Sequence, residues 1–196
     1  MRVVAGKLKG RHLKAPRGRA LRPTADRVKQ ALFNILPHDL SGFRVLDLFA
    51  GTGSLSIEAL SRGAEEAVLV DSSRKAGAAI GENLRNLGLS RRSRVYGAPV
   101  FATLRSISRK GETFDLILLD PPYEKNLVGK TVKAIAEGGL LRESGVVVAE
   151  HSIREKVEEN YGPLGLRDQR RYGATVLSFF AHGARTEGQA KWQRPK

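Results

Sequence analysis

Residues 45–53, Val45-Leu46-Asp47-Leu48-Phe49-Ala50-Gly51-Thr52-Gly53, decide the fold expected for this chain. The mostly apolar run up to Phe49 predicts a buried strand of the kind found in parallel sheets. Gly51 and Gly53 predict a tight turn in which the backbone can approach a ligand closely. A helix is predicted directly afterwards, over residues 54–62. The stretch therefore indicates a strand, turn and helix unit of an α/β domain.

The same pattern repeats along the chain. Strands are predicted at 44–49, 67–70, 94–96, 114–119 and 146–150, and helices at 54–62, 73–87, 99–108 and 127–137. Such alternation predicts a mostly parallel sheet with helices on both faces. Two further strands, 166–172 and 175–181, flank Gly173 and predict a C-terminal antiparallel hairpin. The predicted fold class is α/β, with a mostly parallel seven-stranded sheet.

The N-terminal segment has a different pattern from the core. Residues 1–16 alternate weakly between apolar and polar and predict a short hairpin. A helix is expected to follow, with Thr24 as its N-cap, Asp26 in its first turn and Pro37 at its end. We therefore expect a basic N-terminal hairpin or arm over 1–21, a catalytic domain over 22–181 and a basic, disordered tail over 182–196.

Positive charge is concentrated at the two ends of the chain. The 196 residues have a formal net charge of +14. Residues 1–30 account for +9 of it and residues 182–196 for +3, which leaves +2 for the body between them. A nearly neutral body with basic ends favours a catalytic core that is steered onto a polyanion such as nucleic acid. The alternative is a basic protein without such a partner.

Several classes of protein are disfavoured by composition. The chain has no cysteine, so it has no disulfide framework, thiolate metal site or cysteine nucleophile. Its longest apolar runs are about six residues, far short of a membrane span. No apolar signal-peptide core follows Met1, and we expect a cytoplasmic protein that does not bind membranes. His12, His38, His151 and His182 have no metal-ligand spacing, and no metal is expected.

Two carboxylates indicate the ligand of the Gly51–Gly53 turn. Ser56 stands where the dinucleotide-binding fingerprint has its third glycine, so the ligand need not contain a pyrophosphate. Asp47 would repel phosphate but suits a cationic or amine-bearing ligand. Asp71 comes eighteen residues after Gly53, where an acidic side chain accepts hydrogen bonds from ribose hydroxyls. Together these features point to S-adenosylmethionine, a sulfonium with an amino acid head.

The tetrapeptide Asp120-Pro121-Pro122-Tyr123 directly follows the strand predicted over 114–119. Ligands of open α/β sheets bind at the carboxyl ends of such strands. Asp120 can accept hydrogen bonds, the prolines fix φ and remove two backbone donors, and Tyr123 can stack on a flat ring. The group fits a planar amine such as a nucleobase amino group, although the motif does not distinguish guanine from adenine. The alternative is a strand that simply ends in a proline turn.

These motifs together resemble a known family. The chain is similar to class I S-adenosylmethionine-dependent methyltransferases and, more narrowly, to the RsmD family of bacterial 16S ribosomal RNA guanine-N2 methyltransferases. The resemblance runs from Arg2 to about Phe180 and implies a Rossmann-like fold. It rests on residues 2–6 with Gly10-Arg11, Leu21-Arg22-Pro23-Thr24, Asp26-Arg27-Val28, Leu32-Phe33-Asn34, residues 47–53 and residues 120–123.

The resemblance implies a cofactor site that binds S-adenosyl-L-methionine. The methionine part would be held by Asp47, Phe49, Ala50, Gly51, Thr52 and Gly53, with Thr24 near its end and Asp71 at the ribose. After the third strand, related enzymes usually offer Asp or Asn to the adenine amino group. This chain has Gly97-Ala98-Pro99-Val100 there, so backbone groups and apolar packing around Ala98 would hold the adenine instead.

The resemblance also implies how the acceptor base is held. Asp120 and the Pro121 carbonyl would accept the two amino hydrogens, beside the rigid Pro122, and such orientation can lower a barrier by roughly 7–11 kcal/mol. Tyr123 would stack on the flipped base, which is worth about 1–3 kcal/mol. No cysteine is available for the thiolate-adduct route of pyrimidine ring-carbon methylation.

The expected partner is 16S ribosomal RNA, naked or within a 30S subunit or assembly intermediate, and the protein is expected to be a monomer. Phosphate contacts are expected from Arg2, Lys7, Lys9, Arg11, Arg22 and Arg27. Three alternatives remain. A DNA amino methyltransferase acting on adenine or cytosine would need a larger recognition region than the roughly forty residues outside the core. A non-catalytic RNA-binding module would not need Asp47 or Asp120, and protein amide methylases usually have Asn at position 120.

Overall fold

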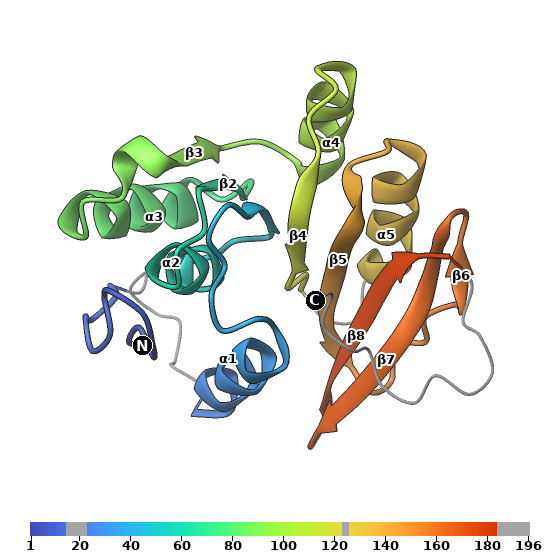
Figure 1. The fold of residues 1–196 in the computed structure, drawn as a ribbon, viewed down its shortest axis with the longest axis horizontal. Coiled ribbons are helices and arrows are strands. Elements are labelled where there is room, and N and C mark those ends of the chain that lie inside the picture. Colours follow the sequence, from blue (N-terminus) through green and yellow to red (C-terminus); the bar gives the residue numbers. More distant parts are fainter. Residues whose placement is uncertain (15–22, 123–125, 184–196) are drawn as a thin grey trace. The chain divides into compact units, whose positions relative to one another are not determined.

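The computed structural model describes residues 1–14, 23–122 and 126–183, and within residues 23–26 only the backbone. Its helices and strands follow in the order α1 (Pro23–Ile35), β1 (Arg44–Leu48), α2 (Ser54–Ser61), β2 (Glu66–Val70), α3 (Arg74–Asn86), the 3-10 helix η1 (Ser90–Arg92), β3 (Ser93–Tyr96), α4 (Val100–Arg109), β4 (Phe114–Leu119), α5 (Leu127–Glu137), β5 (Leu141–Ser152), β6 (Asn160–Tyr161), β7 (Leu164–Tyr172) and β8 (Thr175–His182) (Figure 1). Residues 184–196 of the predicted tail lie outside the described residues.

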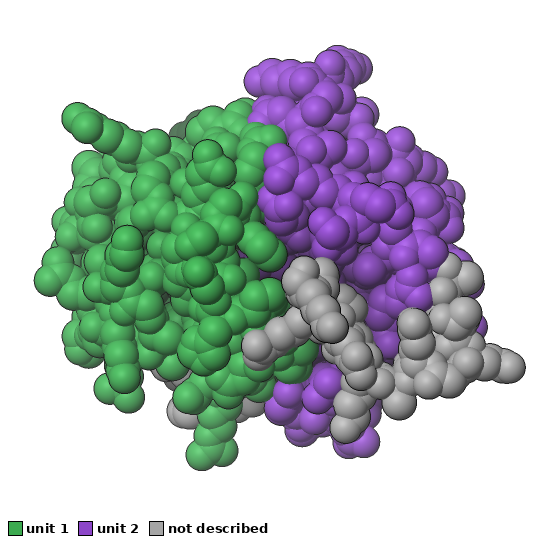
Figure 2. All heavy atoms as spheres, viewed as in Figure 1, with its two compact units in different colours: residues 1–100 green, residues 101–196 purple. Residues whose placement is uncertain are grey.

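The chain divides into two units, residues 1–100 and residues 101–196, which Figure 2 colours separately. In the first unit β1 and β3 both pair in parallel with β2, and Arg44–Leu48 lie opposite Glu66–Val70. Helix α2 packs on β1 and β2, and α3 packs on β3. Val45, Leu46 and Leu48 are fully buried, as the apolar pattern of a parallel strand predicts.

The second unit combines a parallel pair with an antiparallel end. Strand β4 pairs in parallel with β5, and β5, β8, β7 and β6 then pair antiparallel in that order. Leu116–Leu119 are buried on β4, as predicted. Gly173, at φ 64°, forms the tight turn between β7 and β8. This is the predicted C-terminal hairpin, to which the structure adds the two-residue strand β6.

Local sequence signals explain most helix ends in the first unit. The Ser73 hydroxyl accepts a hydrogen bond from the Ala76 N–H at 3.3 Å and caps α3, and Gly88 follows that helix in the left-handed region at φ 68°. The predicted N-cap Thr24 is wrong, because α1 already begins at Pro23. Proline is favoured at the first helical position, since its missing N–H would have no helical partner there. Strand β5 is also longer than the predicted 146–150.

Candidate cofactor and acceptor sites

The turn between β1 and α2 is sharply bent. Phe49, Gly51 and Gly53 have φ values of 64°, 58° and 75°, and the Gly53 N–H closes the turn on the Ala50 carbonyl at 2.8 Å. A side chain at positive φ costs about 1–2 kcal/mol, which explains the two glycines and makes Phe49 a strained residue. A Cβ on Gly53 would lie 3.0 Å from Leu69 Cδ2. The turn therefore leaves backbone groups, rather than side chains, to face a ligand.

Asp47 is a buried carboxylate beneath this turn, only 1% exposed. Its Oδ2 accepts hydrogen bonds from the Ser56 N–H at 3.2 Å and from the Ser56 hydroxyl at 2.8 Å. The carboxylate thus joins the end of β1 to the first turn of α2, where the helix dipole favours negative charge. Sequence reasoning had noted Ser56 only as a missing glycine; the structure makes it the hydrogen-bond partner of Asp47.

Asp71 follows β2 and borders the same turn. Its Oδ2 accepts the Gly51 N–H at 2.9 Å, and its Oδ1 accepts the Ser73 N–H at 2.8 Å. Each carboxylate oxygen has two lone pairs, so both retain the capacity to accept a ribose hydroxyl. The side chain is half-buried. Asp71 therefore holds the turn in place from the neighbouring strand, a role that its spacing from Gly53 did not reveal.

The other predicted cofactor residues differ in how they are placed. Thr52 is half-buried; its carbonyl accepts a hydrogen bond from Asn83 Nδ2 at 3.1 Å, and its hydroxyl donates weakly to Met1 Sδ at 3.5 Å. Phe49 and Ala50 are half-buried, whereas Gly51 is buried. Ala98 follows β3 and is half-buried between two exposed neighbours. Thr24 lies on α1, but its side chain is outside the described part of the structure.

The predicted acceptor motif lies in the second unit, at the carboxyl end of β4. Asp120 is exposed, Pro121 is buried and Pro122 is exposed. An exposed acidic residue and a buried proline therefore follow the strand, and the proline ring restricts the backbone φ angle there. Tyr123 lies outside the described residues, so its predicted stacking role stays a prediction.

Glu155 fixes the start of the helix that follows this motif. It is buried, and its Oε1 accepts the Val128 N–H at 3.1 Å in the first turn of α5. A carboxylate at a helix N-terminus satisfies an otherwise unpartnered donor and interacts well with the helix dipole. Sequence reasoning missed Glu155, because it comes 27 residues after Val128 and outside any recognised motif.

The N-terminal segment forms a small hairpin with an antiparallel bridge between Arg2 and His12. Of the residues predicted to contact RNA, those whose side chains the structure describes are all exposed: Arg2, Lys7, Lys9, Arg11 and Arg27. Arg22 lies outside the described residues. The first unit therefore presents at least five cations to solvent from the hairpin and α1.

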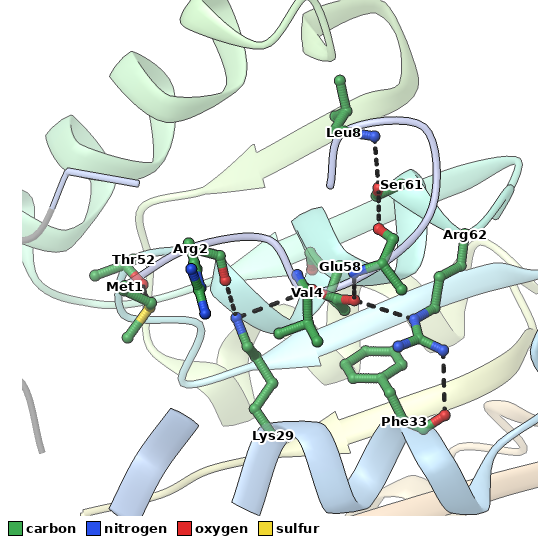
Figure 3. A network of polar contacts seen from close by, with 12 residues as sticks. Met1, Arg2, Val4, Leu8, Lys29, Phe33, Thr52, Glu58, Ser61 and Arg62 are labelled. Atoms are coloured by element: carbon green, nitrogen blue, oxygen red, sulfur yellow. Dashed lines mark hydrogen bonds and ion pairs between the residues drawn. The ribbon is translucent and has the colours of Figure 1, made fainter. Parts of the chain in front are cut away.

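The hairpin is held on α2 by a buried glutamate, as Figure 3 shows. Glu58 is fully buried; its two oxygens accept the Val4 N–H at 2.7 Å and the Ala5 N–H at 2.9 Å. Arg62 Nε donates to the same carboxylate at 3.1 Å, and Lys29 Nζ from α1 lies 3.9 Å from it. The hairpin, α1 and α2 therefore meet at one negative charge.

Further contacts complete this anchor. Lys29 Nζ donates to the Arg2 carbonyl at 2.7 Å, and the Arg62 guanidinium donates to the Phe33 carbonyl at 3.2 Å while lying over the Phe33 ring (Figure 3). The Ser61 hydroxyl accepts the Leu8 N–H at 2.9 Å and donates to a hairpin carbonyl at 2.6 Å. The hairpin is therefore part of the folded unit. Its docking on α2 could have been suspected from Glu58, the one charged residue of that helix.

The part of the chain that the structure describes contains no candidate metal site and no helix suited to span a membrane. Across 1–14, 23–122 and 126–183, no three side chains of the metal-ligating types come together as a candidate metal site. None of the helices in the same ranges combines the length and the apolar character needed to cross a membrane.

Comparison with known proteins places the chain in a family. The family model described as "Conserved hypothetical protein 95" matches residues 1–181. The chain belongs to this family. A relative named "Putative rRNA methyltransferase YlbH", from Bacillus subtilis (strain 168), is 39% identical over 180 residues, which are 92% of this chain and 98% of the relative. "Ribosomal RNA small subunit methyltransferase D" of Escherichia coli (strain K12) is 28% identical over 97% of this chain and 94% of its own.

A solved structure with a similar fold is also described as a methyltransferase. A structure described as "Putative methyltransferase yhhF from Escherichia coli" superimposes with a TM-score of 0.80 at 29% identity, over 94% of this chain and 99% of the other. The resemblance to the RsmD family that was inferred from the sequence motifs is thereby confirmed, as is the predicted α/β fold class.

Proposed function

We propose that this protein transfers a methyl group from S-adenosylmethionine to the exocyclic N2 amino group of a guanine in 16S ribosomal RNA. The observation that supports the reaction type most directly is the exposed Asp120 at the end of β4, backed by the buried Pro121. The glycine turn with Asp47 and Asp71 supports the choice of methyl donor. Two relatives are named "Putative rRNA methyltransferase YlbH" and "Ribosomal RNA small subunit methyltransferase D", and these names support the choice of RNA as acceptor.

The first unit binds the methyl donor in this proposal. S-adenosylmethionine supplies an electrophilic methyl group on a positively charged sulfur. Backbone groups of residues 49–53 hold the methionine part, and the buried negative charge of Asp47 favours a cationic ligand above it. Asp71 accepts hydrogen bonds from the ribose hydroxyls with the lone pairs that Gly51 and Ser73 leave available. Ala98 packs against the adenine, because residues 97–100 provide no carboxylate or amide side chain to bind its amino group.

The second unit orients the acceptor amine. Asp120 and the Pro121 carbonyl accept hydrogen bonds from the two N–H groups of the N2 amine. These bonds orient the nitrogen so that its lone pair points at the methyl carbon. The N–C bond forms as the C–S bond breaks, the sulfur keeps the bonding electrons, and the nitrogen then releases one proton to water. The carboxylate of Asp120 stabilises the positive charge that develops on nitrogen. Pro122 restricts the backbone, and Tyr123 stacks on the base.

The hairpin interacts with phosphate groups of the RNA. Arg2, Lys7, Lys9 and Arg11 are exposed on a segment whose backbone is held by Glu58 and Ser61. Deleting the hairpin would therefore expose a buried charge cluster and disturb the fold. Replacing these four cations by Gln is the cleaner test. Each phosphate interaction that is removed should reduce the slope of log K against log salt by about 0.7–0.9. The control is Lys133→Gln, which removes an exposed cation of α5. If the variant with four substitutions has the same slope as this control, the role of the hairpin is rejected.

The reaction is tested by following radiolabelled methyl groups. The wild-type protein is incubated with 30S particles, naked 16S rRNA and DNA, and the methylated nucleoside is identified by mass spectrometry. We expect N2-methylguanosine in RNA, and the comparison of particle with naked RNA identifies the substrate form. Label found only in DNA, or only on another base, would reject the proposal.

The acceptor role is tested by Asp120→Ala. We expect this variant to bind S-adenosylhomocysteine normally and to lose at least about 100-fold in methyl transfer, since small misplacements of a reacting group cost that much. The matched control is Asp115→Asn on the same strand, which weakens an ion pair with Arg142 at 2.9 Å and should keep its activity. Retained turnover in Asp120→Ala would overturn the assignment. A cytoplasmic location and a monomeric state accompany the proposal; sedimentation tests the latter.

A further inference from the structure

Asn83 lies on α3 between the basic hairpin and the cofactor turn. Its side chain is 2% exposed. Its Oδ1 accepts the Lys14 N–H at 2.8 Å, while Nδ2 donates to the Lys14 carbonyl at 3.0 Å and to the Thr52 carbonyl at 3.1 Å. All of these groups belong to the first unit. One buried amide therefore joins the end of the hairpin, the turn after β1 and helix α3.

Three of the four hydrogen bonds that a primary amide can make are directed toward the two segments. A primary amide has two N–H donors and a carbonyl acceptor, and here both kinds of group are engaged. The paired bonds to the Lys14 backbone resemble those of a strand partner, and an ion pair between Lys14 Nζ and the adjacent Glu82 reinforces them. Movement of the hairpin end would thus change the position of the amide that holds Thr52.

Hydrogen bonds to backbone groups of the turn hold it in place. The Gly51 N–H is held by Asp71, the Gly53 N–H by the Ala50 carbonyl, and the Thr52 carbonyl by Asn83. Asp71 and Asn83 therefore hold consecutive residues of the turn from outside it. Gly51 and Gly53 allow the turn to adopt many backbone conformations, so these hydrogen bonds are needed to stabilise the observed one.

We propose that Asn83 is a positioning residue that couples the RNA-binding hairpin to the cofactor turn. RNA that binds the docked hairpin restricts its remaining motion and, through Lys14 and Asn83, also restricts the motion of the turn that binds the cofactor. Binding of RNA and of cofactor then favour one another, and this coupling is reciprocal by thermodynamic necessity. The identity of the two ligands rests on the proposed function, whereas the physical link between hairpin and turn does not.

The link is tested with three variants of the full chain. Asn83→Ala removes all three hydrogen bonds. Asn83→Asp keeps an acceptor for the Lys14 N–H but cannot donate to the Thr52 carbonyl. The control, Asn86→Ala, replaces an exposed asparagine on the same helix and leaves Asn83, Lys14 and Thr52 unchanged. Thermal unfolding records how far each variant loses overall stability.

Hydrogen exchange of the Gly51 and Gly53 amides is the first readout and needs no ligand. We expect exchange at least about tenfold faster in both Asn83 variants, because the turn loses a hydrogen bond from a buried group and opens more often. Asn86→Ala should leave these amides within about twofold of the wild type. Equal protection in Asn83→Ala and Asn86→Ala would overturn the positioning role.

The second readout is calorimetric binding of S-adenosylhomocysteine with and without an rRNA fragment. We expect RNA to tighten cofactor binding about fivefold or more in the wild type and in Asn86→Ala, and to have no effect in Asn83→Ala. If RNA leaves the wild-type Kd unchanged, the coupling is wrong. A wild type that binds no S-adenosylhomocysteine refutes the proposed function instead, and amide exchange still decides the link between hairpin and turn.

Discussion

Glu58→Gln tests whether the buried carboxylate holds the N-terminal hairpin on α2. The substitution preserves the shape of the side chain and removes its charge. In the wild type Glu58 accepts from two backbone N–H groups and from Arg62, with Lys29 also within 4 Å. A glutamine offers one oxygen to these donors and turns its own NH₂ group toward the others. At least one hairpin N–H loses its acceptor, and two buried cations lose their counter-charge.

The size of the effect follows from burial. The side chains of Arg62 and Lys29 are only 3% and 4% exposed, so water cannot replace the lost carboxylate. Removing one partner of a buried ion pair costs about 3–5 kcal/mol. For a chain of this length, each kcal/mol lowers Tm by about 2–4 °C. We therefore expect Tm to fall by about 6–20 °C and the free energy of unfolding by about 3–5 kcal/mol.

The assay is urea unfolding followed by far-UV circular dichroism, with hydrogen exchange of the Val4 and Ala5 amides measured in parallel. Both amides should exchange much faster in Glu58→Gln. The control is Glu137→Gln, which affects an exposed ion pair with Lys133 and should change stability by less than about 1 kcal/mol. A loss below 1 kcal/mol in Glu58→Gln, with Val4 and Ala5 still protected, would refute the anchoring role.

The remaining predictions concern the hairpin and an alkaline limit to stability. Gly6→Ala should destabilise the fold by more than about 2 kcal/mol, because Gly6 has φ +78° and its new Cβ would lie 2.0 Å from the Ser61 carbonyl oxygen. Gly10→Ala, at φ +84° but in open space, should cost only the backbone strain of about 1–2 kcal/mol; equal urea midpoints for the two variants would contradict the docked hairpin. Burial raises the pKa of Tyr161 above its usual 10.0, so the stability that this residue contributes is complete below pH 10 and is lost as pH rises through the raised pKa. The stability gap between wild type and Tyr161→Phe should therefore narrow above pH 10, and a constant gap from pH 7 to 11 would show that Tyr161 does not set this limit.

Much of the fold could be predicted because its signals are local. The apolar runs of β1 and β4, the Ser73 cap and Gly88 stop of α3, and the Gly173 turn each depend on a few neighbouring residues. The errors lay at boundaries. The start of α1 was misplaced because both Pro23 and Thr24 are favoured near a helix N-terminus. The two-residue strand β6 is too short to show periodicity.

The candidate site was predictable to a lesser extent. Asp47, Asp71 and Asp120 were singled out because they lie near or directly after the carboxyl ends of strands, where ligands bind in α/β sheets. Two residues that bond to elements of the candidate site were not predicted. Ser56 donates to Asp47, and Glu155 accepts from the Val128 N–H at the start of α5; no periodic pattern in the sequence indicates either hydrogen bond.

The sequence by itself determined the α/β fold class, the family and the concentration of positive charge near the N-terminus, since strand periodicity, motif spacing and charge can be read along the chain. Only the tertiary structure decided that the basic N-terminal segment is a docked hairpin. Its partners Glu58 and Asn83 lie 54 and 69 residues from the groups that they bind. Folding buries these side chains, and a buried polar group must find its hydrogen-bond partner wherever the chain brings one within reach.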